Sequence, residues 1–236
     1  MCAVRISWIA VALSLGLGGL FVRAEAKPAS APASSGAAEA PRSLLGRIQQ
    51  RGVLRVGMCV GLLPFVVEGA AVDELLGQFA GDPPPVLTLA DGRRIAGFDV
   101  ELATELGRAL GVKVEVVLVP SFDALLPGLA AGSYDVVASG LTRTLERAQK
   151  VAFTDPYFSS GIEILVRDAT RHDTLAKLNV PASRVAFRRA TTAETLAARK
   201  LPSATRVPID TRDAIYAAMD DPQIDAVVVD TLVARD

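Results

Sequence analysis

The chain has 236 residues, half of them hydrophobic, and its 25 basic and 26 acidic residues leave a net charge of −1. This balance favours neither nucleic acid nor an acidic membrane surface as a partner. The single histidine cannot build a His-rich metal site, so no metal and no other cofactor is expected.

The first 26 residues have the layout of a secretory signal peptide. Arg5 precedes an apolar run over about residues 6–22, and Ala24-Glu25-Ala26 is a small-x-small cleavage site. A membrane anchor is the alternative, but the run is at the lower limit of spanning length, and we favour cleavage. The sequence therefore predicts export to the periplasm. Residues 27–43, rich in Ala, Pro and Ser, then read as a flexible linker.

From residue 44 the pattern alternates between short apolar runs and helical spacing. A strand is expected at 53–58, a helix at 98–110 stopped by Gly111, and a strand at 114–119. Ser121 can cap a helix over 122–129, which Pro127 should shorten or bend. The next strand is expected at 135–138. Strand–helix–strand order predicts a parallel sheet with helices on both faces.

Residues 68–94 break this alternation. One or two helical turns are expected at 72–79, while Asp82-Pro83-Pro84-Pro85 cannot form regular structure. We expect a surface excursion inserted between the first strand and the first helix.

The second half repeats the alternating style. Strands are expected at 184–187, up to Val207 and at 224–229, with helices at 191–199 and from Asp210 to Met219. The boundary is expected near 165–168, which gives a first lobe at 44–165 and a second at 166–236. A cleft between two α/β lobes would receive ligands at the carboxyl ends of the strands.

Polar residues follow the strand at 135–138. Ser139, Gly140 and Thr142 come directly after it, and Thr144 can cap a helix over 145–150. Arg147 falls in the first turn of that helix, where a cation opposes the helix dipole. An arginine placed there suits bidentate capture of a carboxylate, or it forms an ordinary surface pair with Glu146.

Two positions in the second lobe complement this arginine. The backbone N–H groups near Thr192 can receive an anion, or Thr192 belongs to a simple helix cap. Asp230 follows the last strand and can accept hydrogen bonds from an ammonium group, or cap the next helix. Together, an arginine on one lobe and an aspartate on the other would bracket an α-amino acid. The sequence shows no Ser/His/Asp set, acid–base pair or phosphate loop.

Several motifs in order carry a resemblance to a known family. They are RGVLRVG from Arg51, LPF from Leu63, GFDVELATEL from Gly97, FDALLPGLAAGSYDVVASGLTRTLERAQKVAFTDPYF from Phe122, ATTAETL from Ala190 and IDAVVVDTLVA from Ile224. The chain resembles the periplasmic amino-acid-binding proteins of ABC importers, solute-binding protein family 3. The resemblance implies a two-lobed, type II periplasmic-binding-protein fold that closes about a hinge.

The resemblance also implies roles for single residues. Arg147 and Thr142 would hold the ligand α-carboxylate with Thr192 from the second lobe, and Asp230 would hold the α-ammonium group. Ser139 and Gly140 would contact the polar head, and Phe122 would form a wall of the side-chain pocket. The expected partners are a small amino-acid-like zwitterion and an inner-membrane ABC permease, and the protein is expected to be a monomer.

The sequence departs from the family pattern at several positions. Leu62 stands where an aromatic residue is usual, and Cys59 where binders of basic amino acids place an acid; both are candidate pocket walls. These departures disfavour a cationic ligand and favour a polar or apolar side chain. Ala190 replaces a usual glycine. The chain stops at Asp236, so the end of the second lobe and the return to the first are expected to be missing, as in a C-terminally truncated member.

Two other functions stay open on this scaffold. An enzyme similar to the cyclohexadienyl dehydratases would need a proton-transferring carboxylate in the cleft, for which Glu163, Asp155 and Glu68 are the loosely placed candidates. A ligand-sensing domain of a membrane receptor is the other.

Overall fold

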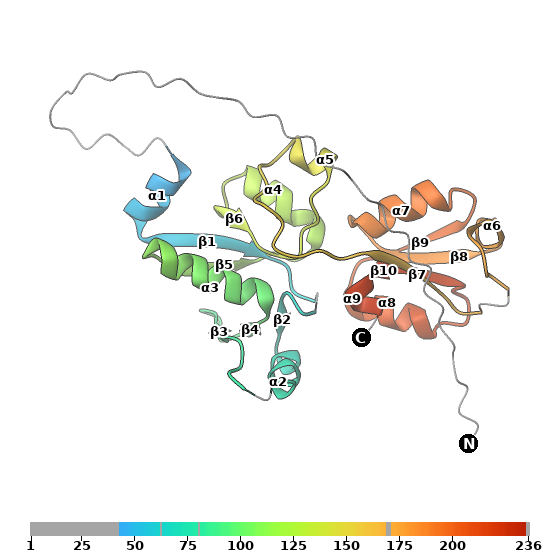
Figure 1. Cartoon of the computed structure of the whole chain (residues 1–236), viewed down its shortest axis with the longest axis horizontal. Helices are drawn as coiled ribbons and strands as arrows, with labels where there is room; N and C mark the ends of the chain where they lie inside the picture. Colours follow the sequence, from blue (N-terminus) through green and yellow to red (C-terminus); the bar gives the residue numbers. More distant parts are fainter. Residues whose placement is uncertain (1–42, 62, 80, 169–170, 235–236) are drawn as a thin grey trace.

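The structure of the protein is a computed structural model that describes residues 43–61, 63–79, 81–168 and 171–234. The expected signal peptide and nearly all of the expected linker lie outside these ranges. Figure 1 shows two bodies of helices and strands, joined by an extended stretch between helix α5 and strand β7. We call residues 44–148 the first lobe and residues 162–234 the second lobe.

The first lobe is built around a parallel sheet in the order β5-β1-β6. Its elements are α1 (Leu44–Arg51), β1 (Val53–Met58), β2 (Val67–Glu68), α2 (Ala70–Gly77), β3 (Leu87–Thr88), β4 (Arg94–Ala96), α3 (Phe98–Leu110), β5 (Lys113–Leu118), the 3-10 turn η1 (Phe122–Ala124), α4 (Leu125–Ala130), β6 (Val136–Val137) and α5 (Leu145–Ala148). The central strand β1 supplies the middle of the core, because Leu54, Val56 and Met58 are all buried.

Two helices of this lobe, expected at 98–110 and at 122–129, end or divide at the residues that the sequence indicates. Helix α3 ends at Gly111, whose left-handed backbone closes the last turn, as the sequence indicates. The helix expected at 122–129 is split into η1 and α4, which confirms the shortening expected from Pro127. Pro127 is tolerated because it lies in the first turn of α4, where its missing N–H would have no helical partner.

The segment expected as a surface excursion is more regular than the sequence suggests. Strands β2, β4 and β3 pair in an antiparallel sheet, and α2 packs beside it. Val67, Val72, Leu75 and Ala96 form a separate buried cluster there. The helical turns expected at 72–79 are confirmed by α2. The proline run at 83–85 lies outside helices and strands, as expected, but the short strands around it form a sheet that the sequence did not predict, because the pairing joins residues far apart in the chain.

The second lobe has one four-stranded sheet in the order β7-β10-β8-β9. Its elements are β7 (Ile162–Val166), α6 (Leu175–Leu178), β8 (Arg184–Arg188), α7 (Thr192–Lys200), β9 (Thr205–Ile209), α8 (Arg212–Asp220), β10 (Ala226–Asp230) and α9 (Thr231–Ala234). Across the described ranges of both lobes, no helix is long and apolar enough to cross a membrane.

Strand β10 lies at the centre of this sheet and is apolar on both faces. Ala226 and Val228 join the cluster that α7 covers, while Val227 and Val229 join the cluster that α8 covers. This follows from the strand period of two, and it explains why the sequence shows a continuous apolar run instead of an alternating one. Figure 1 shows α7 and α8 on opposite sides of the sheet.

The boundary expected at 165/166 is wrong by one strand. It would divide β7, whose residues pair antiparallel with β10, for example Leu165 with Val227. The sequence could not show to which lobe β7 belongs, because an apolar strand at a lobe boundary fits either sheet. Pairing with a distant strand, β10, determines the sheet that it joins. The chain therefore crosses between the lobes before Ile162.

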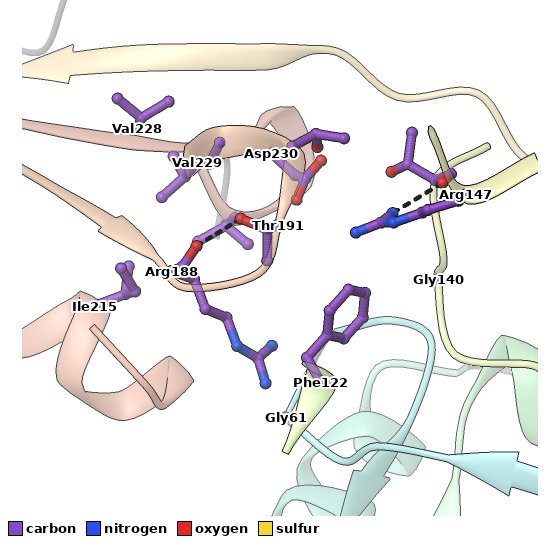
Figure 2. A pocket seen from close by; sticks show the side chains of 14 residues that line it. Gly61, Phe122, Gly140, Arg147, Arg188, Thr191, Ile215, Val228, Val229 and Asp230 are labelled. Carbon is purple, nitrogen blue, oxygen red and sulfur yellow. Dashed lines mark hydrogen bonds between the residues drawn. The ribbon is translucent and has the colours of Figure 1, made fainter. Parts of the chain in front are cut away.

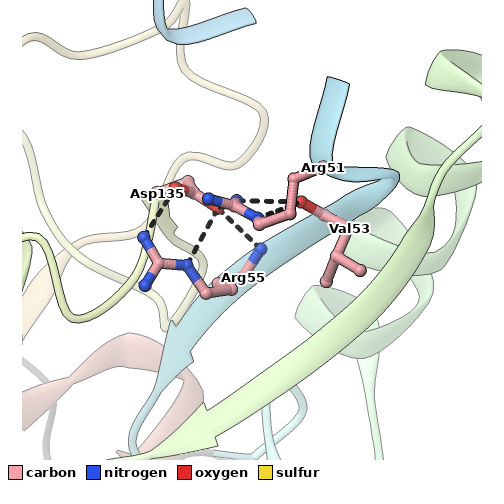
Figure 3. A network of polar contacts seen from close by, with 4 residues as sticks. All are labelled: Arg51, Val53, Arg55 and Asp135. Carbon is pink, nitrogen blue, oxygen red and sulfur yellow. Dashed lines mark hydrogen bonds and ion pairs between the residues drawn. The ribbon is translucent and has the colours of Figure 1, made fainter. Parts of the chain in front are cut away.

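A buried carboxylate at the start of β6 fixes the amino-terminal end of the first sheet (Figure 3). Asp135 accepts a hydrogen bond from the Arg55 backbone N–H at 2.8 Å and from Arg55 Nη2 at 3.0 Å, and it pairs with Arg51. Burial by itself would raise the pKa of Asp135, but the hydrogen bonds from Arg55 and the two positive charges outweigh it and hold the pKa below its usual value.

We expect Asp135→Asn to destabilise the protein at pH 7 by about 1–3 kcal/mol, since the amide keeps the shape and loses the charge-assisted bonds. The folded-state pKa lies below the unfolded one, so this stabilisation is present at neutral pH and is lost as the pH falls below about 3.9. Urea unfolding of both proteins from pH 7 to pH 3 should show their difference shrinking with acid.

Asp73→Asn is the matched control, because Asp73 forms an exposed pair with Arg94 at 3.0 Å. It should change the free energy of unfolding by less than about 0.5 kcal/mol. An equal loss in both variants, or a difference that grows as the pH falls, would contradict the assignment.

Candidate functional site

A cavity that is partly open to solvent lies between the lobes at the carboxyl ends of β6, β8 and β10. Ligands of open α/β folds bind at this end of the strands. Figure 2 shows the side chains around it. Its lining residues are Gly61, Phe122, Gly140, Thr142, Arg147, Arg188, Thr191, Thr192, Ala193, Ile215, Val228, Val229, Asp230 and Val233.

Arg147 reaches the cavity from the short helix α5. Thr144 caps this helix by accepting a hydrogen bond from the Arg147 backbone N–H at 3.2 Å. The guanidinium donates from Nη1 to the Thr142 carbonyl at 2.8 Å and from Nη2 across the cleft to the Ala190 carbonyl at 2.9 Å. Burial lowers the pKa of Arg147, yet a guanidinium stays charged at neutral pH. Each Nη atom keeps a second N–H for a ligand.

The second lobe presents the first turn of α7 to the same space. Thr191 precedes this nine-residue helix, but its hydroxyl donates to the Arg188 carbonyl at 2.7 Å instead of capping the helix. Backbone N–H groups at Thr192 and Ala193 therefore lie at the cavity wall without a side-chain cap. Ala190 has a left-handed backbone, with φ of 59°, which explains why a glycine suits this position.

Asp230 is the last residue of β10 and lies half-buried in the cavity wall. Burial raises the pKa of its carboxyl, and the positive charge of Arg188 offsets this only in part. A carboxylate in such a place gains from a cationic ligand group that replaces the lost water.

Two guanidinium groups flank one aromatic ring. The Cζ of Arg147 lies 5.7 Å from the ring centroid of Phe122, and the Cζ of Arg188 lies 5.5 Å from it. Phe122 belongs to the first lobe and Arg188 to the second, so the ring contacts both sides of the cleft. Figure 2 shows Phe122 between the two side chains.

The structure brings most of the residues predicted from the sequence to one place. Those that line the cavity are Phe122, Gly140, Thr142, Arg147, Thr192 and Asp230. Two others, Ser139 and Cys59, are buried and are not among the residues that line the cavity. The Ser139 hydroxyl accepts a hydrogen bond from the Cys59 backbone N–H at 2.9 Å and donates one to the Cys59 carbonyl. Ser139 therefore fastens the ends of β1 and β6 together. Leu62 lies outside the described residues.

Sequence reasoning missed two residues that shape the site. Arg188 lines the cavity from the end of β8, and its position directly after a predicted strand was the same signal that pointed to Asp230. Asp99 is fully buried and accepts a hydrogen bond from the Gly140 N–H at 2.6 Å, so it holds the loop that carries Thr142. Asp99 is one of two acidic residues in the first turn of α3, with Glu101, so in the sequence it resembles the acidic residues common at a helix start.

The described residues of the lining carry charges of both signs, on Arg147, Arg188 and Asp230. Of the described residues, the lining ones include a single carboxylate, Asp230, and no cysteine or histidine. The described part of the chain also brings together no group of three or more His, Cys, Asp or Glu side chains suited to a metal ion. A cation and a carboxylate on opposite walls, with free N–H groups between them, can orient a zwitterion.

Two α/β lobes with a cavity between them at the carboxyl ends of their strands define a type II periplasmic binding protein, and the similar solved structures have this fold. The chain belongs to family 3 of the bacterial extracellular solute-binding proteins. The sequence profile of that family matches residues 78–200. Proteins of this family work outside the cytoplasm.

Individual relatives include both binding proteins and an enzyme. The chain is 26% identical to the ABC transporter arginine-binding protein 1 of Escherichia coli K12, over 74% of this chain and 70% of that protein. It is 27% identical to the cyclohexadienyl dehydratase of Pseudomonas aeruginosa, over 86% and 68%. A crystal structure of the ancestral amino acid-binding protein AncCDT-1, a precursor of cyclohexadienyl dehydratase, superposes with a TM-score of 0.67 at 34% identity, covering 82% of this chain and 76% of that one.

We expect Asp230→Asn to raise the melting temperature of the unliganded protein at pH 7 by about 2–4 °C. The folded-state pKa of this acid is raised, so its ionised form at neutral pH favours the unfolded chain, and the amide removes that cost. The gain should vanish below about pH 3.9, where the carboxyl is protonated in both states. Thermal unfolding at pH 7 and pH 3.5 measures this.

Asp210→Asn provides the comparison, because Asp210 also follows a strand but forms an exposed pair with Arg189. It should leave the melting temperature nearly unchanged. A lower melting temperature for Asp230→Asn at pH 7 would mean that the folded chain already satisfies this charge.

Proposed function

We propose that this protein binds a free α-amino acid in the inter-lobe cavity and delivers it, as a periplasmic monomer, to an ABC importer of the inner membrane. The observation that carries the proposal is the placement of Arg147 and Asp230 on opposite walls of one cavity. An α-amino acid has one carboxylate and one ammonium group on the same carbon, so a cation and an anion facing each other match its head group.

Arg147 is assigned the α-carboxylate. Its guanidinium is held by the Thr142 carbonyl at 2.8 Å, which leaves further N–H groups directed into the cavity. Thr142 and the start of α7 at Thr192 complete the carboxylate site from the two lobes. A carboxylate there would replace no existing ion pair, because the present acceptors of Arg147 are neutral carbonyls.

Asp230 is assigned the α-ammonium group, and Phe122 the wall against which the ligand side chain packs. Lobe closure is part of the proposal, since the carboxylate site draws on both lobes. The contact from Arg147 to the Ala190 carbonyl at 2.9 Å is the contact between lobes that a bound carboxylate would reinforce.

An enzymatic function similar to that of cyclohexadienyl dehydratase is the second candidate, favoured by the sequence similarity to that enzyme. It requires a group that moves a proton inside the cavity. Glu163, Asp155 and Glu68 are not among the residues that line it. Asp230 is the one carboxylate among the described lining residues. If it binds the ligand's ammonium group, it stays ionised and paired and is not free to transfer a proton. These points support the binding function over the enzymatic one.

The test begins with a thermal-shift screen of the standard amino acids, followed by titration calorimetry of those that stabilise the protein. Arg147→Ala should weaken binding of the best ligand by about 2–5 kcal/mol, because it leaves the ligand carboxylate buried without its charged partner. Arg147→Lys should fall between the two, since it keeps the charge and loses the planar fork.

Arg143→Ala is the control, because Arg143 is an exposed arginine of the same loop and does not line the cavity. It should bind as the wild type does. Absence of binding to every amino acid, or equal affinity in Arg147→Ala, would overturn the proposal. Turnover of a cyclohexadienyl substrate by the protein would replace it with the enzymatic function.

A further inference from the structure

Arg188 is the one charged residue of the described lining that an α-amino acid head group does not use. It ends β8, and Figure 2 shows its side chain reaching from the second lobe toward Gly61 and Phe122 of the first lobe. Its guanidinium therefore lies at the end of the cavity where the ligand side chain would extend, away from the site between Arg147 and Asp230.

The guanidinium of Arg188 is poorly satisfied by the protein. Its Nε is buried and has no hydrogen-bond partner within the described chain. Its Nη2 makes a weak contact with Cys59 Sγ at 3.8 Å. No carboxylate of the described residues lies within ion-pair distance of it. A buried donor left unpaired costs free energy, so a ligand that supplied an acceptor here would recover it.

Asp230 does not serve as the partner of Arg188, although β8 and β10 are neighbours. Side chains alternate between the faces of a sheet, so Arg188 shares a face with Ala186 and Asp230 shares a face with Val228. Ala186 packs in the cluster under α8, and Val228 in the cluster under α7. The two charges therefore leave the sheet in different directions, and each is available to a different part of a ligand.

The charges of the lining do not balance. Arg147 and Arg188 contribute two positive charges and Asp230 one negative charge. An amino acid whose side chain is neutral would leave the total unchanged, because its own head group is neutral overall. A side chain that carries a negative charge would cancel the excess.

A purely structural role explains Arg188 less well. Its guanidinium lies on Phe122, a ring that Arg147 also contacts, so two like charges share one aromatic partner. A leucine or methionine would fill the same space beside Ile215 without the burial of an unpaired N–H. A ligand anion that accepts hydrogen bonds from the Arg188 guanidinium explains the charge at this position.

We propose that Arg188 determines the specificity of this cavity, and that the ligand is an α-amino acid with a carboxylate in its side chain. This inference rests on the proposed function, since it assumes that the head group lies between Arg147 and Asp230. The sequence favoured a polar or apolar side chain and disfavoured a cationic one, and an acidic side chain narrows that expectation.

Titration calorimetry with L-glutamate, L-aspartate, their amides L-glutamine and L-asparagine, and L-arginine tests the proposal. The wild type should bind an acidic amino acid at least about tenfold more tightly than its amide. Arg188→Gln should lose this preference, with affinity for the acid falling at least about tenfold and affinity for the amide unchanged or improved. Arg188→Lys should restore part of the preference, because it returns the positive charge.

Arg189→Gln is the matched control, since Arg189 is the adjacent exposed arginine and pairs with Asp210 at 2.8 Å outside the cavity. It should keep the wild-type preference. If the wild type favours an amide, L-arginine or an apolar amino acid, or if Arg188→Gln keeps the preference while its thermal unfolding shows that it is folded, the specificity inference is overturned and the proposed function stands. If no amino acid binds, both fail.

Discussion

The buried carboxylate of Asp99 is the constraint on which the first-lobe wall of the cavity depends. It is fully buried, and it accepts hydrogen bonds from the Gly140 N–H at 2.6 Å and from the Tyr157 hydroxyl at 2.8 Å. Burial raises the pKa of Asp99, and these two bonds oppose that shift. Because a buried carboxyl without partners is costly, helix α3, the loop after β6 and the chain that leads to the second lobe must stay together.

This constraint explains how a short, irregular loop can hold a charged group in place. Gly140 begins the stretch that carries Thr142 and Arg147, and the second lobe meets it through the bond from Arg147 to the Ala190 carbonyl. The position of Arg147 thus follows from contacts at both of its sides. The four-residue helix α5 alone would not fix it, since so short a helix has little stability of its own.

The cavity collects several features that each cost stability in the unliganded chain. Asp230 is a desolvated carboxylate, Arg188 has an unpaired buried donor, and Ala190 adopts a left-handed backbone that favours glycine. Elsewhere in the second lobe the sheet is apolar on both faces and well packed. Concentration of unfavourable features at one place is typical of a functional site, where a ligand or a mechanism compensates for them.

The sequence by itself determined the α/β class, most of the helices and strands of the two main sheets, and two site residues, because periodicity and caps are local properties. These residues are Arg147 in the first turn of a short helix and Asp230 at a strand end. The tertiary structure decided which of these side chains face the cavity. In the folded protein Ser139 links the ends of β1 and β6 by hydrogen bonds, and does not contact the cavity. Arg188 lines the cavity, and β7 pairs in the second sheet. These outcomes depend on which side chains of each strand face the cleft, and on pairing between residues far apart in the chain. Local sequence patterns contain neither kind of information.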